Sequence, residues 1–301
     1  MPQQAQPEGA QQSAPKPRLW PLDALAGELV NDARNAHEAH KTGQPRGPQT
    51  GLKRLDRAIG GAFPKDALTM ILGNTGAGKT AFAGQIVARC GFPAVYLSTE
   101  MAPVELLRRH VARESSTFLG RLKSGELSPV EVERLVTQTA RALAHLKILD
   151  GTTAYAPVSY LRDVMDAAKG DAKHAVLVID SLHTWARASG TGAGEYDALN
   201  DHLGALVRLS KQARCSIVVI CEQNRAAMKD GAAGNPNAGA GTRFIEYSAD
   251  LLFDLDAAKS QDGAGERAVN LTIAKNRNGA PGQPIALEFN GELQRFQEVE
   301  K

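Results

Sequence analysis

The chain has 301 residues, of which 43% are hydrophobic and 23% charged, as expected for a globular protein that folds around a large core. Its 35 basic and 33 acidic residues nearly balance, which excludes a histone-like polycation and an acidic tail protein. The three cysteines have no CxxC spacing, so neither a disulfide framework nor a zinc ribbon is expected. The sequence has neither a bilayer-spanning apolar run nor a signal pattern, which predicts a cytoplasmic protein without a membrane partner.

The N-terminal region differs in composition from the rest of the chain. Residues 1–18 are rich in Gln, Pro and Ala and are expected to form a disordered tail. Residues 21–41 carry apolar side chains at helical spacing and are predicted to form an amphipathic helix. Its apolar stripe consists of Leu22, Leu25, Leu29 and Val30. We therefore assign residues 19–49 to a helix and a linker, and residues 50–301 to one folded domain.

From about residue 50, short apolar runs alternate with helical stretches, as in a largely parallel sheet covered by helices. The predicted strands are 67–72, 94–99, 147–150, 175–180, 216–221 and 249–255. The predicted helices are 79–90, 103–116, 128–146, 156–169 and 195–213. No helix separates 268–276 from 284–291, which are predicted to form an antiparallel hairpin. The predicted fold class is therefore α/β, with a mostly parallel sheet and a C-terminal antiparallel hairpin.

Residues 73–80 follow a predicted strand, open a predicted helix and match the GxxxxGK[ST] pattern of a Walker A P-loop. The motif consists of Gly73, Asn74, Thr75, Gly76, Ala77, Gly78, Lys79 and Thr80. Backbone N–H groups of such a loop, together with the helix N-terminus, suit the phosphates of ATP. Lys79 is expected to reach the β- and γ-phosphates, and Thr80 is expected to ligate Mg²⁺.

Two carboxylates at predicted strand ends are candidates for the rest of the nucleotide site. Asp180 ends the apolar run 175–180, which is a Walker B pattern, and is expected to hold Mg²⁺. The next residue is Ser181 rather than a glutamate, so the general base must come from elsewhere. Glu100 follows the first strand after the P-loop helix, and we expect this strand to be adjacent to that of the P-loop. Glu100 is therefore the candidate catalytic base.

STEM, at 98–101, resembles the SLEM-type motif of the RecA/DnaB superfamily, and more closely that of DnaB-type replicative helicases. Four further stretches resemble the ATPase domain of that family in the same order. They are TGLKRLDRAIGG (50–61), LKSGELSPVEVERL (122–135), IEYSADLLFDL (245–255) and AKNRNGAPGQPIALEF (274–289). The resemblance covers residues 50–290 and implies a RecA-like P-loop NTPase core within the 50–301 domain.

The resemblance also implies roles for residues beyond the P-loop. Arg277 matches the family's arginine finger, which reaches the nucleotide of the next subunit in a ring, and Lys275 matches its basic companion. The family places a phosphate-sensing glutamine after the strand that follows Walker B, where this chain has Glu222 and Gln223. The alignment can place either Glu222 or Gln223 at the position of that glutamine. Gln223 is favoured because a neutral amide bonds to a phosphate oxygen, whereas a carboxylate repels it.

Two predicted loops, 186–196 and 223–244, correspond to the family's pore loops, which contact single-stranded DNA. The candidate phosphate contacts in these loops are Arg187, Arg225, Lys229 and Arg243. Few aromatic side chains accompany these cations. The resemblance therefore implies DNA binding that is mainly electrostatic, independent of sequence and sensitive to salt.

Taken together, the resemblance implies an ATP- and Mg²⁺-dependent DNA helicase motor. Its expected partners are single-stranded DNA, other copies of the chain in a hexameric ring, and a helicase loader or replication initiator. Replicative helicases of the family carry a sizeable N-terminal domain, whereas here a tail and the helix at 21–41, which matches their linker helix, precede the ATPase segment. One alternative is a RecA/RadA/KaiC-like ATPase acting in recombination or regulation without unwinding. A slowly hydrolysing nucleotide-binding partner protein is another.

Overall fold

The computed structural model describes residues 19–190, 192, 194–222, 247–258, 265–280, 282 and 284–299. The chain divides into two compact units, Met1–Arg46 and Gly47–Lys301. Helix α1 (Leu22–Thr42) belongs to the first unit, as the periodicity predicts, and none of its residues is buried. The predicted tail at 1–18 lies outside the described residues. Among the described residues, no helix combines the length and the apolar character needed to cross a membrane.

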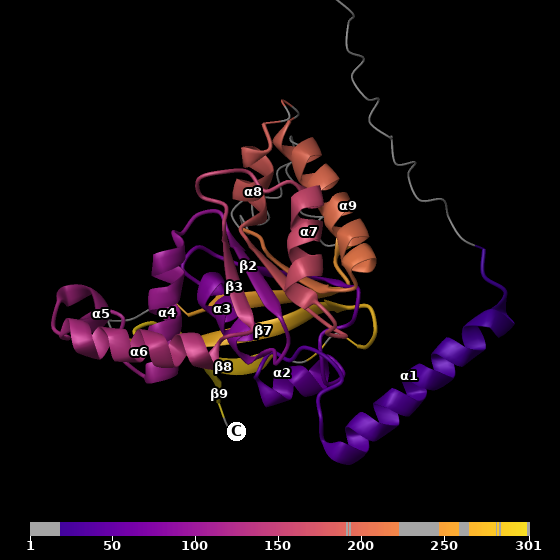
Figure 1. Ribbon diagram of the computed structural model, residues 1–301, viewed down its shortest axis with the longest axis horizontal. Helices are drawn as coiled ribbons and strands as arrows, with labels where there is room; N and C mark the ends of the chain where they lie inside the picture. Colours follow the sequence, from indigo (N-terminus) through magenta and orange to yellow (C-terminus); the bar gives the residue numbers. More distant parts are fainter. Residues whose placement is uncertain are drawn as a thin grey trace, which may run out of the picture. The chain divides into compact units, whose positions relative to one another are not determined.

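The second unit is built on a sheet whose described part has nine strands, in the order β3-β2-β4-β5-β1-β6-β7-β8-β9 (Figure 1). The parallel strands are β1 (Leu68–Gly73), β2 (Ala94–Ser98), β3 (Leu146–Asp150), β4 (Val176–Asp180), β5 (Ser216–Ile220) and β6 (Leu251–Ala257). The antiparallel strands that extend the sheet are β7 (Glu266–Asn276), β8 (Ile285–Asn290) and β9 (Arg295–Glu298). The predicted α/β class, with its mostly parallel sheet and antiparallel C-terminal part, is confirmed.

Strand order corrects one expectation about the site. β2, which precedes Glu100, was expected beside β1 but pairs with β3 and β4. β4 and β5 lie between β2 and the P-loop strand. Glu100 therefore approaches the nucleotide site from beyond the Walker B strand, and its immediate neighbour is the carboxyl end of β4.

Helices connect the strands and cover both faces of the sheet. Their bounds are α2 (Lys53–Ala58), α3 (Lys79–Arg89), α4 (Pro103–Ser115), α5 (Arg121–Ser124), α6 (Pro129–Ala142), α7 (Val158–Lys169), α8 (Leu182–Ala188) and α9 (Glu195–Ala213). Ser128 caps α6, since its hydroxyl accepts from the Glu131 N–H while the Glu131 carboxylate accepts from the Ser128 N–H. The helix predicted over 128–146 is too long, because α6 ends at Ala142 and β3 begins four residues later.

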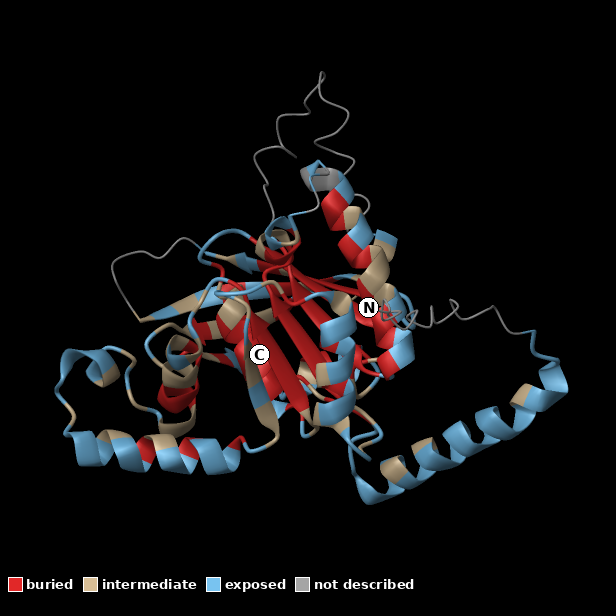
Figure 2. Ribbon diagram, turned by 45° about the horizontal axis from the view of Figure 1, so that its top comes forward, coloured by how far each residue is buried: buried red, intermediate tan, exposed pale blue. Residues whose placement is uncertain are grey.

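Residues on successive positions of the parallel strands enter two different hydrophobic clusters. In β4, Val178 packs with residues of α3 in one cluster, while Leu177 and Ile179 pack with residues of α7, α8 and α9 in the other. Both sheet faces are therefore covered, and Figure 2 shows the buried residues concentrated in the central strands. This arrangement explains why these strands are continuously apolar in sequence rather than alternating.

Candidate nucleotide site

The P-loop connects the end of β1 to the start of α3, at the carboxyl edge of the parallel strands. Gly78 sits at its base with φ of 90°, a left-handed conformation that glycine adopts at least cost. A Cβ atom at Gly78 would lie 2.9 Å from Cζ of Phe296, which belongs to β9. The loop therefore rests directly on the C-terminal strand, and a side chain at this position has no room.

The Lys79 side chain folds back across the P-loop. Its Nζ donates to the carbonyl oxygens of Gly73 at 2.8 Å and Asn74 at 3.2 Å. Burial lowers the pKa of Lys79, while the negative charges of Glu222 and Asp180 oppose that effect. The ammonium is thus held over the loop by backbone dipoles, in the place where a phosphate would compete for its N–H groups.

Thr80 and Asp180 lie against each other, with the Thr80 hydroxyl donating to Oδ2 of Asp180 at 2.8 Å. The Tyr96 hydroxyl donates to the same oxygen at 2.7 Å. Burial raises the pKa of Asp180, and these hydrogen bonds partly offset the rise. A hydroxyl and one carboxylate suit Mg²⁺, which is typically held by one or two carboxylates together with substrate phosphates. Among the described residues, no group of three or more His, Cys, Asp or Glu side chains offers another metal site.

Glu100 lies just beyond the end of β2 and is held by two hydroxyl groups at the start of α8. Its Oε1 accepts from Ser181 Oγ at 2.5 Å and from Thr184 Oγ1 at 2.7 Å. Burial alone would raise the pKa of Glu100, but these two hydrogen bonds and the positive charges of Lys79 and Arg187 outweigh it. The net effect lowers the pKa, so the carboxylate stays ionised at neutral pH, as a base requires.

A cavity of about 360 Å³ unites these groups. It is lined by Thr75, Gly76, Gly78, Lys79, Thr80, Glu100, Asp180 and Glu222, among others. Of the remaining P-loop residues, Gly73 and Ala77 are buried beneath the loop, and Asn74 contributes its carbonyl oxygen to Lys79. Segments distant in sequence thus supply one cavity with a cation, oxygen ligands for a metal and an ionised carboxylate.

Sequence reasoning missed several side chains that line the same cavity. Arg109 comes from α4, Arg267 from β7 and Phe289 from β8, while Gln294 comes from the turn before β9. Arg267 pairs with Phe289 across the two strands, its guanidinium lies 4.9 Å from the centroid of the Phe289 ring, and it donates to the Gly76 carbonyl. The antiparallel pairing of β7 with β8 creates this contact, and no local sequence motif predicts it.

Lys275 and Arg277 do not line the cavity. Asn276 lies opposite Leu251, and Leu251 lies opposite Thr69 at the amino end of β1, whereas the P-loop follows the carboxyl end. Nζ of Lys275 donates to the Tyr247 carbonyl at 3.0 Å. Nη1 of Arg277 donates to Asp250 at 2.7 Å, and 63% of the Arg277 side chain is exposed. Within one chain, these two cations therefore lie at the edge of the sheet opposite the P-loop.

The described residues include only one of the four predicted DNA contacts, Arg187. Arg187 was expected in a loop spanning 186–196, but it is an exposed residue in the last turn of α8, because that helix continues to Ala188. The end of the same predicted loop, from Glu195, belongs to α9. Gln223, Arg225, Lys229 and Arg243 lie outside the described residues. Of the two candidate phosphate sensors, Glu222 is described and lines the cavity.

A parallel sheet with a Walker A loop after β1 and carboxylates at the ends of β2 and β4 defines a P-loop ATPase of the RecA-like class. Within that class, the chain belongs to the family of the DnaB-like helicase C terminal domain, whose model matches residues 47–298. The resemblance read from the sequence motifs is thereby confirmed. The family match and the fold together support an ATP-hydrolysing enzyme.

Two curated relatives illustrate the similarity. The chain is 28% identical over 282 residues to the replicative DNA helicase DnaB of Treponema pallidum (strain Nichols), covering 90% of this chain and 61% of that protein. It is 24% identical over 243 residues to the DNA repair and recombination protein RadB of Methanosphaera stadtmanae, covering 78% of this chain and 90% of that protein. The chain thus spans less than two thirds of the length of the DnaB relative.

Solved structures confirm the RecA-like fold. One solved ATPase domain superposes with a TM-score of 0.75 at 18% identity, covering 92% of this chain and 99% of that chain. A DnaB-like replicative helicase, studied with its interactions with primase, superposes with a TM-score of 0.71 at 16% identity, covering 93% of this chain and 72% of that chain.

Proposed function

We propose that this chain is a DnaB-like helicase motor that hydrolyses ATP between the subunits of a ring and translocates on single-stranded DNA. The observation that carries this proposal is the convergence of Lys79, Thr80, Asp180 and Glu100 on one cavity at the carboxyl edge of the sheet. A phosphate-binding cation, oxygen ligands for a divalent metal and an ionised carboxylate are the groups that ATP hydrolysis requires.

Each of these groups has a distinct role in the proposed reaction. Lys79 holds the β- and γ-phosphates, and Thr80 and Asp180 hold Mg²⁺, which neutralises phosphate charge when bound. Glu100 accepts a proton from the attacking water, because its carboxylate is ionised and faces the same cavity. Arg109 and Arg267 add positive charge to the cavity wall, where the negative charge of ATP would otherwise stand uncompensated.

The position of Arg277 supports hydrolysis at an interface between subunits. At about 3.3 Å per residue, β1 alone separates the two edges of the sheet by roughly 16 Å, so Arg277 is out of reach of its own P-loop. We propose that the same residue reaches the nucleotide of a neighbouring copy, as an arginine finger acting with Lys275. We therefore infer a homo-oligomeric ring, most simply a hexamer, in which α1 docks on the neighbouring subunit through Leu22, Leu25 and Leu29.

DNA is proposed to pass through the centre of this ring. The proposed phosphate contacts are Arg187, Arg225, Lys229 and Arg243. Such contacts bind any sequence and weaken as salt rises. A helicase loader or replication initiator is the corresponding protein partner.

The test is ATP turnover with and without single-stranded DNA, together with unwinding of a 5′-tailed duplex. We expect DNA to stimulate turnover, and ATP to be required for unwinding. Lys79→Ala should abolish tight ATP binding, because it removes the cation that faces the β- and γ-phosphates, whereas Lys173→Ala on the exposed surface should not. Unchanged ATP affinity in Lys79→Ala would contradict the nucleotide site itself.

The similarity to RadB favours one alternative, an ATPase that acts in recombination without unwinding DNA. It shares the nucleotide site and differs in its action on DNA. DNA-stimulated turnover accompanied by filament formation, with no unwinding of the tailed duplex, would favour this alternative.

A further inference from the structure

The turn between β8 and β9 ends at Gln294, a residue with two unusual properties. Its φ is 54°, in the left-handed region that residues other than Gly, Asn and Asp seldom adopt. It is also only 6% exposed, although its side chain is polar. A strained backbone at a buried polar residue persists only where the surroundings hold it in place, and such residues cluster at functional sites.

Both polar groups of the Gln294 side chain are used. Its Oε1 accepts a hydrogen bond from Nη1 of Arg109, and its Nε2 donates to the Gly291 carbonyl at 2.5 Å. Its backbone carbonyl accepts from Nε of Arg113 at 2.8 Å. Gln294 therefore contacts two arginines one turn apart on α4, one with its side chain and the other with its backbone.

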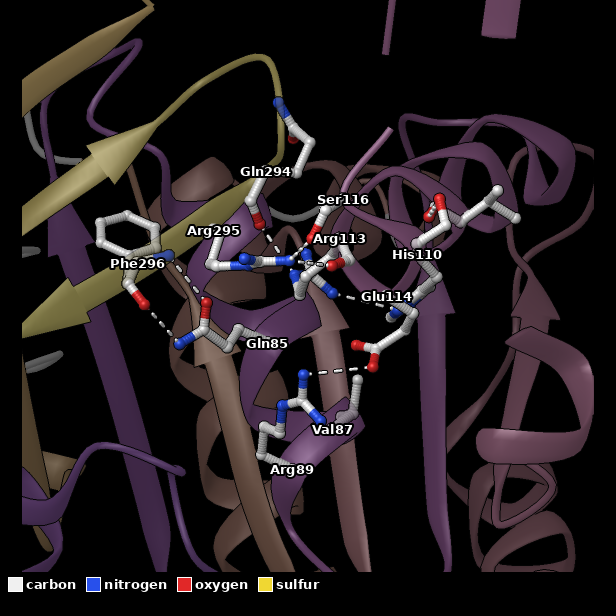
Figure 3. A network of polar contacts seen from close by, with 12 residues as sticks. Gln85, Val87, Arg89, His110, Arg113, Glu114, Ser116, Gln294, Arg295 and Phe296 are labelled. Atoms are coloured by element: carbon white, nitrogen blue, oxygen red, sulfur yellow. Dashed lines mark hydrogen bonds and ion pairs between the residues drawn. The ribbon is translucent and has the colours of Figure 1, made fainter. Parts of the chain in front are cut away.

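Arg113 fixes this turn to the P-loop helix. It is 2% exposed, and its Nη2 donates to the carbonyl of Ala81 in the first turn of α3. Burial lowers the pKa of Arg113 to about 10, which leaves it charged at neutral pH. Figure 3 shows its guanidinium between Gln294 and His110, and Nδ1 of His110 accepts from it at 3.1 Å.

Two further contacts close the same network. Gln85 of α3 accepts from the Phe296 N–H at 2.8 Å and donates to the Phe296 carbonyl at 3.0 Å (Figure 3). The Arg295 guanidinium donates to the Arg113 carbonyl. The first residues of β9, the P-loop helix and α4 are thus held together by buried hydrogen bonds. The position of the Gln294 amide is therefore fixed relative to the nucleotide cavity.

Arg109 is the member of this network that lines the cavity. Its Nε is buried and has no hydrogen-bond partner among the described residues. The Gln294 amide oxygen thus holds Nη1 of the guanidinium, and Arg109 lines the same cavity as Lys79 and Thr80. An arginine held by a hydrogen bond in the wall of a cavity that also contains a lysine is preorganised to bind a polyanion.

We propose that Gln294 is a positioning residue that holds the Arg109 guanidinium against the phosphates of bound ATP. This proposal rests on the proposed function, because it needs ATP as the ligand of the cavity. It assigns to the turn before β9, far from the Walker motifs in sequence, a part in nucleotide affinity.

The test compares Gln294→Met with the matched control Gln297→Met, in which an exposed glutamine of β9 is replaced. Methionine keeps the side-chain length but removes the amide that holds Arg109. We expect the dissociation constant of a slowly hydrolysed ATP analogue and the KM for ATP to rise about tenfold, the usual size of a lost charge-assisted hydrogen bond. kcat should change much less, and the control should match the wild-type protein.

A double-mutant cycle separates positioning from a merely structural role. If Gln294 acts through Arg109, Gln294→Met should have less than about a twofold effect in an Arg109→Ala background. Gln294→Asn provides a second variant, since asparagine tolerates the left-handed backbone but its shorter side chain cannot hold Arg109 in place. It should show the same loss of affinity. Thermal unfolding of each variant identifies those that fold.

Additive effects in the cycle, or wild-type affinity in both folded Gln294 variants, would overturn the positioning role. Either result leaves the proposed function standing, because Lys79→Ala tests that function separately. If Lys79→Ala itself kept wild-type ATP affinity, the proposed function would fail first. The two failures are therefore distinguishable.

Discussion

The Glu100 carboxylate receives hydrogen bonds from Ser181 and Thr184, at the start of the helix that follows the Walker B strand. These bonds orient the carboxylate and keep it ionised, at some loss of basicity. The same helix carries Arg187, one of the proposed DNA contacts. A displacement of α8 by DNA would therefore move the two hydroxyl groups that hold the proposed catalytic base.

Glu100→Gln should retain ATP binding and lose turnover by about 10²–10⁴-fold, because an amide has nearly the same shape but cannot accept the proton. The measurement is steady-state ATP hydrolysis together with binding of a slowly hydrolysed ATP analogue. Glu133→Gln, on the exposed face of α6, is the control. Turnover close to wild type in Glu100→Gln would assign the reaction to another carboxylate.

Individual site residues differ in how readily the sequence reveals them. Lys79 and Thr80 lie in one contiguous motif, and Asp180 ends an apolar run, so local patterns point to them. Arg267 and Gln294 reach the cavity only because the antiparallel strands return beside the P-loop. A side chain placed by long-range pairing leaves no signal in its own neighbourhood.

At the scale of elements, the P-loop and β9 support each other. Phe296 packs against Phe82 of α3, with ring centroids 5.3 Å apart, and stacks on Phe289 at 4.4 Å. Its ring also lies beneath Gly78. The nucleotide loop is therefore braced by an aromatic cluster from the last strand of the sheet.

Gly78→Ala should destabilise the fold more than Gly76→Ala, which is a matched control. Both residues have positive φ, so each substitution should cost about 1–2 kcal/mol of backbone strain. Of the two, only Gly78 has a neighbour within 4 Å of an added Cβ, which should add about 1–3 kcal/mol. The measurement is urea unfolding of both variants. Equal losses of stability would show that Phe296 moves away freely.

The parallel strands were predicted closely because both of their faces are buried, which gives continuous apolar runs. β9 and the helices α2 and α8 were missed, since each is short and its pattern indistinct. The position of β2 was predicted wrongly beside β1. The order of strands in a parallel sheet depends on how the crossover helices pack. Strands that are consecutive in sequence therefore need not be neighbours in the sheet.

At the scale of the whole second unit, the two edges of the sheet carry different chemistry. The carboxyl edge holds the nucleotide cavity, and the amino edge holds Arg277, paired with Asp250. A head-to-tail arrangement of copies would bring one edge to the other, whereas a lone subunit cannot. The domain boundaries proposed from the sequence, with the ATPase segment starting near residue 50, are compatible with such a ring.

Mixing two inactive variants tests this arrangement. Arg277→Ala should bind ATP, but its turnover rate should fall about 10³–10⁵-fold. Lys79→Ala should fail to bind ATP. In a 1:1 mixture, about a quarter of the interfaces of a randomly mixed ring join an intact pocket to an intact finger, so turnover should return in part. The measurement is ATP hydrolysis across mixing ratios, with mixed oligomers verified. No recovery at any ratio would show that Arg277 does not act across an interface.

The central position of β1 has a consequence for the order in which the chain folds. β1 is the first strand of the sheet to be synthesised, yet its neighbours are β5 and β6, and the Leu68 N–H bonds to a carboxylate 182 residues further along the chain. Contacts between such distant segments form slowly. Until β5 and β6 pair with it, the apolar strand β1 is prone to aggregate. The P-loop gains its brace from Phe296 later still. We therefore expect nucleotide binding at this loop to require a nearly complete fold.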